Sequence, residues 1–230
     1  ENIQELKEKV LLEGPGETMI PACPLMHGTG LLTAINAICN GGTVITLESP
    51  SLDAPEILQA IEEHKVNSIT IVGDAFAQPI LTELDKNPER YDLSSLKSVI
   101  SSGVMWSQES KKRLLKYIPQ AALADAFGSS EALGFGTSIT TAEHSSSTAK
   151  FITNDYCKVF DEDDKEIPRG SDKPGFIAFG GPMPVGYYGD EAKTAKTFKT
   201  INGHRYSIPG DYCTVAKDGT LTLLGRGSSC

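Results

Sequence analysis

The stretch DAFGSSEALG, residues 125–134, combines side chains suited to holding a nucleotide. The carboxylate of Asp125 can accept from an exocyclic amine, and the ring of Phe127 offers a face on which a base can stack. The hydroxyls of Ser129 and Ser130, with backbone N–H groups at the start of the helix expected to follow, suit a phosphate. This polar loop at the end of an apolar run is therefore a candidate nucleotide site.

Glu131 adds the group that a metal ion needs, because carboxylate oxygens are ligands that Mg²⁺ prefers. A purely structural interpretation fits the same residues. Ser130 then serves as an N-cap, and Glu131 occupies the first helical position, where the helix dipole favours an acid. Composition leaves the site and the capped turn equally open, and both interpretations predict a helix from residue 131.

Three more residues have useful chemistry but ordinary alternatives. His27 in PLMHGTG lies at an expected helix start, where a polar side chain is also a normal cap. Asp211 follows Pro-Gly between two expected strands, a position where aspartate commonly bonds its own backbone. Arg226 has five donors suited to an anion or a ribose, although a lone arginine is usually a surface residue.

Strand and helix patterns alternate through the first part of the chain. The expected helices cover residues 2–12, 27–40, 53–65, 74–86 and 107–118, and the expected strands cover 18–25, 43–47, 66–72, 96–101 and 121–127. This order predicts an α/β fold, with a mostly parallel sheet and covering helices over about residues 18–145. Ligands bind at the carboxyl ends of strands in such sheets, which is where DAFGSSEALG falls.

Past about residue 145 the helical periodicity disappears. Short β-like runs separated by Gly, Pro and Asp predict an antiparallel β-barrel-like subdomain. The acidic stretch 161–170 lies between two such runs, which favours a solvated hairpin tip over a metal site. The expected division is a connecting helix at 1–17, an α/β subdomain at 18–145, a β-barrel subdomain at 146–226 and the start of a hinge at 227–230.

Composition excludes several classes of protein. A formal net charge of -9 argues against non-specific nucleic-acid binding, which needs clustered Lys and Arg. The five cysteines show no C-x-x-C spacing, so neither a disulfide framework nor a zinc site is indicated, and reduced thiols favour a cytoplasmic location. No apolar run approaches the roughly 20 residues of a membrane span. The sequence also has no Walker phosphate loop and no G-x-S-x-G elbow.

Five motifs taken in order carry more information than any one of them. They are PLMHGTG, SSGVMWS, DAFGSSEALG, GYYGDEAKTAKTF and YSIPGDYCTVAKDGTLTLLGR, spread over about residues 20–226. This series resembles the ordered core motifs of the adenylate-forming (AMP-binding) superfamily, and the last two are most similar to bacterial fatty-acid-CoA ligases. The resemblance implies that a fatty acid or other carboxylic acid attacks ATP to give an acyl-adenylate, which CoA then takes up. It also implies Mg²⁺ as the metal.

The resemblance assigns roles to individual residues. It implies that His27, Ser130 and Glu131 are catalytic and that Glu131 binds Mg²⁺; Ser130 stands where Thr is more usual, which keeps the hydroxyl. The residues that it implies for the ATP or AMP site are Gly103, Val104, Asp125, Phe127, Gly128, Ser129, Ser130, Asp211 and Arg226. The residues that it implies beside the acyl group are His27, Met105, Trp106 and Gly134.

Two elements of the superfamily pattern have no counterpart in this sequence. The Gly/Ser/Thr-rich phosphate loop with its lysine is expected before residue 1, and the lysine-bearing C-terminal domain is expected after residue 226. The chain is therefore expected to be the central part of a larger ligase and to be inactive alone. The alternatives are a truncated homologue that binds acyl groups or a protein partner without catalysis, and an acyl-AMP or aryl-acid ligase. Peripheral membrane contact stays open.

Overall fold

The computed structural model describes residues 2–104, 106–144, 150–171 and 173–226 of the chain. The chain forms two compact units. Unit 1 comprises Glu1–Asp125 with Ile139–Ser145, and unit 2 comprises Ala126–Ser138 with Ser146–Cys230. Strand β5 (Ala122–Ser129) runs along the chain from the first unit into the second.

Unit 1 alternates strands and helices. Its elements are α1 (Ile3–Glu13), β1 (Thr18–Pro21), α2 (Gly28–Cys39), β2 (Thr43–Val44), α3 (Ala54–Glu63), β3 (Ser68–Ile71), α4 (Gly73–Lys86), β4 (Ser98–Ser101), α5 (Gln108–Tyr117) and the first half of β5. The pairings β2–β1, β1–β3, β3–β4 and β4–β5 are all parallel. The full strand order in this sheet is β2-β1-β3-β4-β5-β6-β7, where β6 is Ala132–Thr140 and β7 is Ile152–Thr153.

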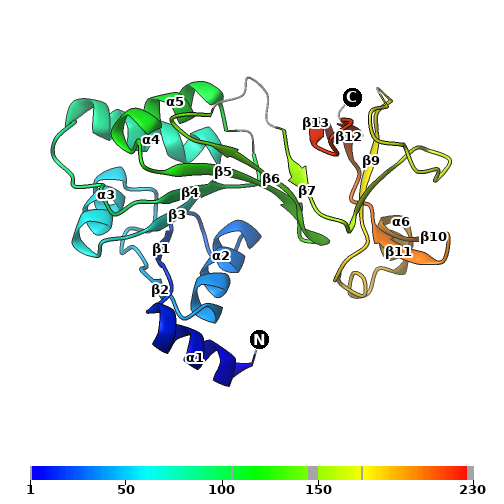
Figure 1. Ribbon diagram of the computed structural model, residues 1–230, viewed down its shortest axis with the longest axis horizontal. Coiled ribbons are helices and arrows are strands. Elements are labelled where there is room, and N and C mark those ends of the chain that lie inside the picture. The colour runs from blue at the N-terminus through cyan, green and yellow to red at the C-terminus, as the bar shows by residue number, and fades with distance from the viewer. Residues whose placement is uncertain (1, 105, 145–149, 172, 227–230) are drawn as a thin grey trace. The chain divides into compact units, whose positions relative to one another are not determined.

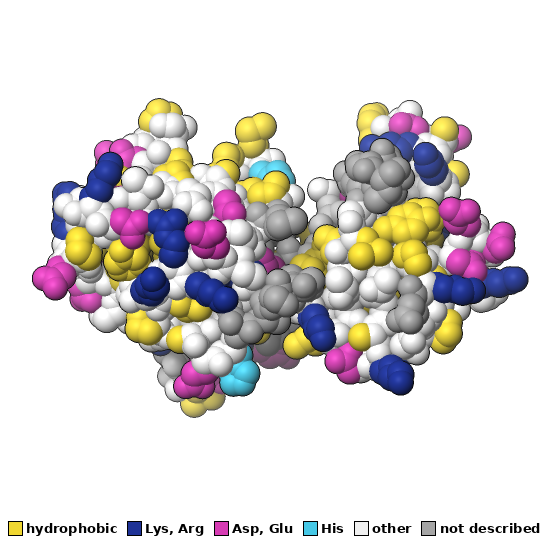
Figure 2. Space-filling model, turned by 90° about the horizontal axis from the view of Figure 1, so that it is seen from above, with side chains coloured by type: hydrophobic (Ala, Val, Ile, Leu, Met, Phe, Trp, Pro, Cys, Tyr) yellow, Lys and Arg dark blue, Asp and Glu magenta, His cyan; other side chains and the backbone are white. Residues whose placement is uncertain are grey.

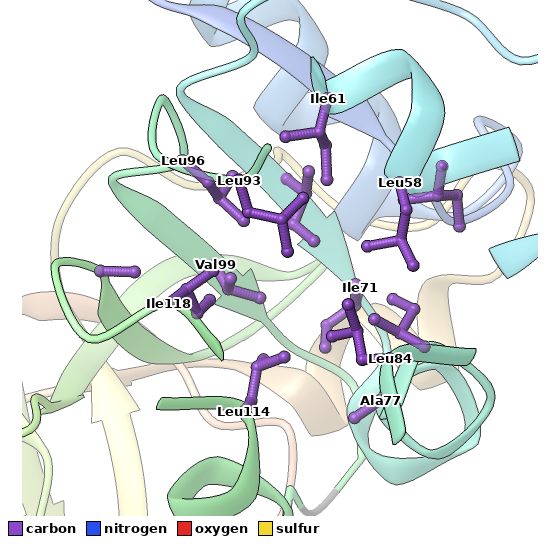
Figure 3. Packing of buried hydrophobic residues seen from close by; sticks show 14 of the residues in the cluster. Leu58, Ile61, Ile71, Ala77, Leu84, Leu93, Leu96, Val99, Leu114 and Ile118 are labelled. Atoms are coloured by element: carbon purple, nitrogen blue, oxygen red, sulfur yellow. The ribbon is translucent and has the colours of Figure 1, made fainter. Parts of the chain in front are cut away.

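Helices cover both faces of this sheet. Figure 1 shows α3, α4 and α5 on one face and α2 on the other. The main core lies under α3, α4 and α5, where Leu58, Leu84 and Leu114 meet Ile71 and Val99 from the strands (Figure 3). A smaller cluster joins Met19 of β1 to two alanines of α2. Ile20, the next residue of β1, belongs to the main core, so Met19 and Ile20 pack on opposite faces of the sheet, as the alternation of side chains along a strand requires.

Helices α3 and α5 of unit 1 begin at the polar caps that the sequence predicts. The Asp53 side chain accepts from the backbone N of Glu56 at 3.0 Å at the start of α3. The Ser107 hydroxyl accepts from the backbone N of Ser110 at 3.2 Å at the start of α5. Each cap satisfies one of the free N–H groups of a first helical turn, which fixes where the helix starts.

Unit 2 is built mainly from antiparallel strands. Its elements are the second half of β5, β6 (Ala132–Thr140), β7 (Ile152–Thr153), β8 (Cys157–Phe160), β9 (Gly175–Phe179), α6 (Glu191–Thr197), β10 (Phe198–Ile201), β11 (His204–Ser207), β12 (Asp211–Val215) and β13 (Leu221–Arg226). Strands β10-β11-β9-β12-β13 form one sheet, with β8 paired to β9. Phe135, Phe151, Ile177 and Phe179 are buried in its core.

The predicted α/β class, with a mostly parallel sheet followed by antiparallel strands, is confirmed. The helix predicted from residue 131 is wrong, because Ser130 and Glu131 form the turn between β5 and β6. A strand forms here instead of a helix because β6 buries Ala132 and Phe135 in the unit 2 core. The expectation of strands without helices past residue 145 is also wrong, because α6 forms there. Its N-cap is Asp190, whose side chain accepts from Lys193 N at 2.9 Å.

Charges of both signs are mixed over the surface. On the face in Figure 2, Lys and Arg side chains lie scattered among Asp and Glu rather than gathered into one basic field. This arrangement agrees with the net charge of -9. Among the residues that the structure describes, no helix is long and apolar enough to cross a membrane.

Candidate functional site

Glu131 lies in the two-residue turn that joins β5 to β6 in unit 2. Its carboxylate Oε1 accepts from the hydroxyl of Tyr187 at 2.5 Å. Burial raises the pKa of Glu131, but the hydrogen bond from Tyr187, a backbone N–H and the charge of Lys193 outweigh it, so the pKa lies below its ordinary value. Glu131 is therefore a half-buried carboxylate that stays ionised at neutral pH.

The two serines before Glu131 differ in their surroundings. Ser130 is exposed in the turn. The Oγ of Ser129 is buried without a well-formed hydrogen bond, although it lies close enough to Glu131 to help lower that carboxylate's pKa. A buried hydroxyl that lacks a full partner is one that an incoming acceptor can satisfy.

Phe127 and the nearby glycines shape the hairpin. The Phe127 ring is half-buried, with its centroid 5.1 Å from that of Phe135 and 5.3 Å from that of Phe151. Gly128 lies where the two strands approach closely, since a Cβ there would lie 3.2 Å from the backbone N of Gly134. Phe127 thus contributes to the unit 2 core, and its stacking against a base stays a prediction.

Asp211 and Arg226 lie opposite one another in unit 2. Asp211 opens β12 directly after Gly210, whose φ of +101° favours glycine. The register of β12 with β13 pairs Asp211 with Arg226. Residues directly opposite in an antiparallel pair hold their Cβ atoms about 5 Å apart. The backbone therefore brings together two residues that the sequence separates by one whole hairpin.

In unit 1, His27 and the loop after β4 are neighbours. His27 is the N-cap of α2, and its Nδ1 accepts from the backbone N of Thr29 at 3.2 Å. A neutral His27 bonded in this way carries its proton on Nε2. Gly103 has a φ of +93°, and a Cβ there would lie 3.4 Å from Cε1 of His27. The capping alternative for His27 is therefore confirmed, and its Nε2 side faces the predicted Gly103 loop.

The carboxylate of Asp125 is bound to a lysine. Lys111 of α5 donates to Asp125 Oδ2, and the two side chains are 1% and 14% exposed. Burial raises the pKa of Asp125, and Lys111 opposes that rise. Trp106, predicted beside an acyl group, is 3% exposed in the unit 1 core, where Lys111 Nζ lies 5.3 Å from its ring centroid. Asp125 and Trp106 thus share a buried cluster.

Two of the remaining predicted residues, Val104 and Gly134, are exposed to solvent. Val104 is 56% exposed beyond β4, and Gly134 is exposed in β6, where its carbonyl accepts from Asn154 at 2.9 Å. Met105 lies outside the described residues, and so does the Arg226 side chain. The predicted residues thus form separate groups. Unit 1 contains the neighbours His27 and Gly103 and, apart from them, Asp125. Unit 2 contains the β5–β6 hairpin with Glu131 and the opposed residues Asp211 and Arg226.

Comparison with known proteins identifies the family. A sequence model described as "AMP-binding enzyme" matches residues 2–188. The chain belongs to the AMP-binding enzyme family. The resemblance predicted from the five motifs is therefore confirmed.

Relatives within the AMP-binding family are acyl-CoA ligases by name. The "Medium/long-chain-fatty-acid--CoA/3-oxocholest-4-en-26-oate--CoA ligase" of Mycobacterium marinum is 42% identical over 221 residues, which are 96% of this chain and 40% of that protein. The "3-oxocholest-4-en-26-oate--CoA ligase" of Rhodococcus rhodochrous is 42% identical over 223 residues, covering 94% and 40%. The chain spans about 40% of the length of the curated relatives it matches.

A solved structure shows the same fold at lower identity. The amide bond synthetase McbA from Marinactinospora thermotolerans matches with a TM-score of 0.75 and 23% sequence identity. The match covers 97% of this chain and 44% of that one. The arrangement of a mostly parallel sheet and an antiparallel sheet is thus shared with enzymes of other names.

The Mg²⁺ that the AMP-binding family implies fits what Glu131 offers. Among the described residues there is no group of three or more His, Cys, Asp or Glu side chains that could hold a metal alone. Mg²⁺ does not need one, because it is commonly held by one or two carboxylates together with water and substrate phosphates. An ionised, half-buried carboxylate in a turn has the chemistry that such a site requires from the protein.

Two side chains at these groups, Lys111 and Tyr187, are not predicted by the sequence patterns. Lys111 was not singled out, yet it lies three and four positions before Leu114 and Leu115, on the buried face of α5. A lysine on an apolar stripe is a signal for a buried partner. Tyr187 lies inside a motif quoted above, but nothing local in the sequence indicates that its hydroxyl reaches a residue 56 positions away.

Proposed function

We propose that the protein containing this chain is an ATP-dependent fatty-acid-CoA ligase, an acid–thiol ligase. The observation that carries the proposal is the ionised Glu131 in the β5–β6 turn of a chain that the AMP-binding family matches over residues 2–188. The names of the relatives support a medium- or long-chain fatty acid, or a steroid side-chain acid, as the substrate.

The proposed reaction has two steps, adenylation of the acid and transfer of the acyl group to CoA. A carboxylate oxygen of the acid forms a bond to the α-phosphorus of ATP, and the bond from that phosphorus to the bridging oxygen breaks as pyrophosphate leaves. The sulfur of CoA, having lost its proton to solvent, then bonds to the acyl carbon, and AMP leaves. Mg²⁺, when bound, offsets the negative charge that gathers on the phosphates.

The residues of unit 2 bind and orient the nucleotide in this proposal. Glu131 holds the cation, and Ser129 and Ser130 with nearby backbone N–H groups bind phosphate oxygens, which places fixed donors where charge develops. Asp211 accepts from the ribose hydroxyls, and Arg226 binds the ribose or a phosphate. Register pairing supports this last assignment, since it sets Asp211 and Arg226 opposite each other.

Phe127 with Gly128 contacts the base, and Asp125 is assigned there too, with Lys111 fixing its carboxylate. In unit 1, Gly103 and Val104 flank the nucleotide.

The residues assigned to the acyl group, on the family resemblance, are His27, Met105, Trp106 and Gly134. The Nε2–H of His27 is available to an anion, since Nδ1 already accepts from Thr29.

The proposed location of the protein is the cytoplasm. The free thiols at Cys23, Cys39, Cys157 and Cys213 support this location, because thiols stay reduced there.

The 230 residues alone are proposed to lack turnover, since they span about 40% of the relatives' length. The test is product analysis of the full reading frame that contains them, given ATP, Mg²⁺, CoA and a panel of fatty, steroid and aryl acids. An acyl-CoA thioester from a fatty or steroid acid is expected. An acyl-adenylate that CoA does not consume indicates an acyl-AMP ligase instead, thioester from aryl acids alone indicates an aryl-acid ligase, and no adenylate from any acid indicates a non-catalytic homologue.

A further inference from the structure

In unit 2, the carboxylate of Glu131 accepts a hydrogen bond from the phenol of Tyr187. The O–H···O bond measures 2.5 Å and joins two half-buried side chains. Hydrogen bonds from O–H to a carboxylate are short and roughly twice as strong as those between neutral groups. A carboxylate has about four acceptor positions, so this bond orients Glu131 and leaves acceptor capacity for a cation.

Tyr187 is itself held from several sides. Its backbone N donates to Thr194 Oγ1 at 2.9 Å, and that hydroxyl donates to Asp190 O at 2.7 Å. Lys193 Nζ lies 4.0 Å from the centroid of the Tyr187 ring, and the Phe198 ring lies 5.8 Å away. These contacts hold Tyr187 in place, so its hydroxyl reaches Glu131 from a fixed position.

Gly186 allows the chain to pass close to Thr194 just before Tyr187. A Cβ at Gly186 would lie 2.6 Å from Cγ2 of Thr194, closer than a real side chain can approach. Its φ of +157° is also one that favours glycine. The chain doubles back here, so that Tyr187 and the helix α6 form one compact support.

We propose that Tyr187 is the positioning residue that orients Glu131 for Mg·ATP, without itself touching metal or nucleotide. The inference rests on the proposed function, because it takes Glu131 as the ligand of Mg²⁺. Groups that orient a metal ligand through a hydrogen bond typically change metal affinity by 10- to 100-fold when they are removed.

The experiment uses the full-length protein that contains these residues. Calorimetric titrations with Mg·ATP, and with ATP in EDTA, are compared for wild type, Tyr187→Phe and Glu131→Gln. Phe keeps the ring between Lys193 and Phe198 and removes only the donor. We expect about tenfold weaker Mg·ATP binding by Tyr187→Phe and unchanged binding of metal-free ATP.

The adjacent tyrosine is the matched control. Tyr188 is fully exposed, and Tyr188→Phe should bind both forms of ATP as wild type does. Wild-type Mg·ATP affinity in Tyr187→Phe overturns the inference, and so does an equal loss for both forms of ATP, which indicates general damage. Wild-type Mg·ATP affinity in Glu131→Gln overturns the metal role of Glu131 and, with it, the inference; failure of Tyr187→Phe alone leaves the proposed function standing.

Discussion

Replacing Lys111 with Met should destabilise unit 1 strongly. The change leaves Asp125, whose side chain is 14% exposed, as a buried charge without its cation. Breaking a buried ion pair from one side costs about 3–5 kcal/mol, and partial exposure of Asp125 points to the lower end, about 3 kcal/mol. That figure corresponds to about a hundredfold in the folding equilibrium.

The single tryptophan of the sequence is a local probe for this change. Trp106 lies in the unit 1 core, 5.3 Å from Lys111 Nζ measured to its ring centroid. Urea unfolding of the 230-residue chain, followed by Trp106 fluorescence, therefore reports on the unit that contains the pair. The slope of the transition should stay constant while the midpoint falls.

The pH dependence of Lys111→Met has a defined sign. Burial raises the pKa of Asp125, and loss of Lys111 raises it further. A carboxyl whose pKa is higher when folded binds its proton more tightly in the folded state. Its penalty is therefore full above the folded pKa and fades as the pH falls toward the unfolded value, about 3.9. The deficit of Lys111→Met should thus be smaller near about pH 5 than at neutral pH.

A double variant completes the test. Lys111→Met with Asp125→Leu replaces the pair by apolar side chains of similar size, which is often neutral in a buried site. It should recover to within about 1 kcal/mol of wild type. A cost below about 1 kcal/mol for Lys111→Met alone, or a double variant as unstable as the single one, would refute the reasoning.

Two further predictions concern thiol reactivity and a helix cap. Burial, with a contribution from Asp211, raises the pKa of Cys213 to about 12, so in native protein at pH 8 iodoacetamide should label exposed Cys39 and spare Cys213; peptide mapping that finds both labelled equally contradicts this. Asp53→Ala removes the acceptor for Glu56 N at the start of α3, so unfolding followed by Trp106 should show a loss of about 1 kcal/mol, and an unchanged midpoint contradicts the capping role.

The helices that the sequence predicts best are those with a cap and two or more turns of apolar spacing. α3 follows Asp53 and α5 follows Ser107, as the cap residues indicate. α6 was missed because its seven residues are too few to show a period. Its cap, Asp190, was the available signal.

The turn at Glu131 shows how tertiary packing overrides a local signal. Ser-Glu before an apolar run is typical of a helix start, yet burial of Phe135 in the unit 2 core favours a strand. Gly134 and Gly136 also disfavour a helix in this segment. Gly134 has a φ of +84°, and a Cβ at Gly136 would lie 2.9 Å from the carbonyl oxygen of Ile152. Glycines at this density disfavour a helix.

The candidate site follows the same division. Residue types alone left Glu131 and Asp211 open between a binding site and an ordinary turn, and only the order of the five motifs, with the family resemblance that it carries, favoured the site. The partners of Glu131 and Asp125, which are Tyr187 and Lys111, come from segments distant in the sequence, so only folding brings them into contact. Side chains that hold a functional group in place leave little trace in local sequence patterns.

The most direct test of the central claim is pyrophosphate exchange by the full-length protein that contains this chain. With a fatty acid present, labelled pyrophosphate should enter ATP, because formation of the acyl-adenylate is reversible. Glu131→Gln keeps the size of the side chain and removes its charge, and it should lower the exchange rate at least about a hundredfold. Exchange that does not depend on the acid, or a Glu131→Gln variant that exchanges at the wild-type rate, would contradict the account.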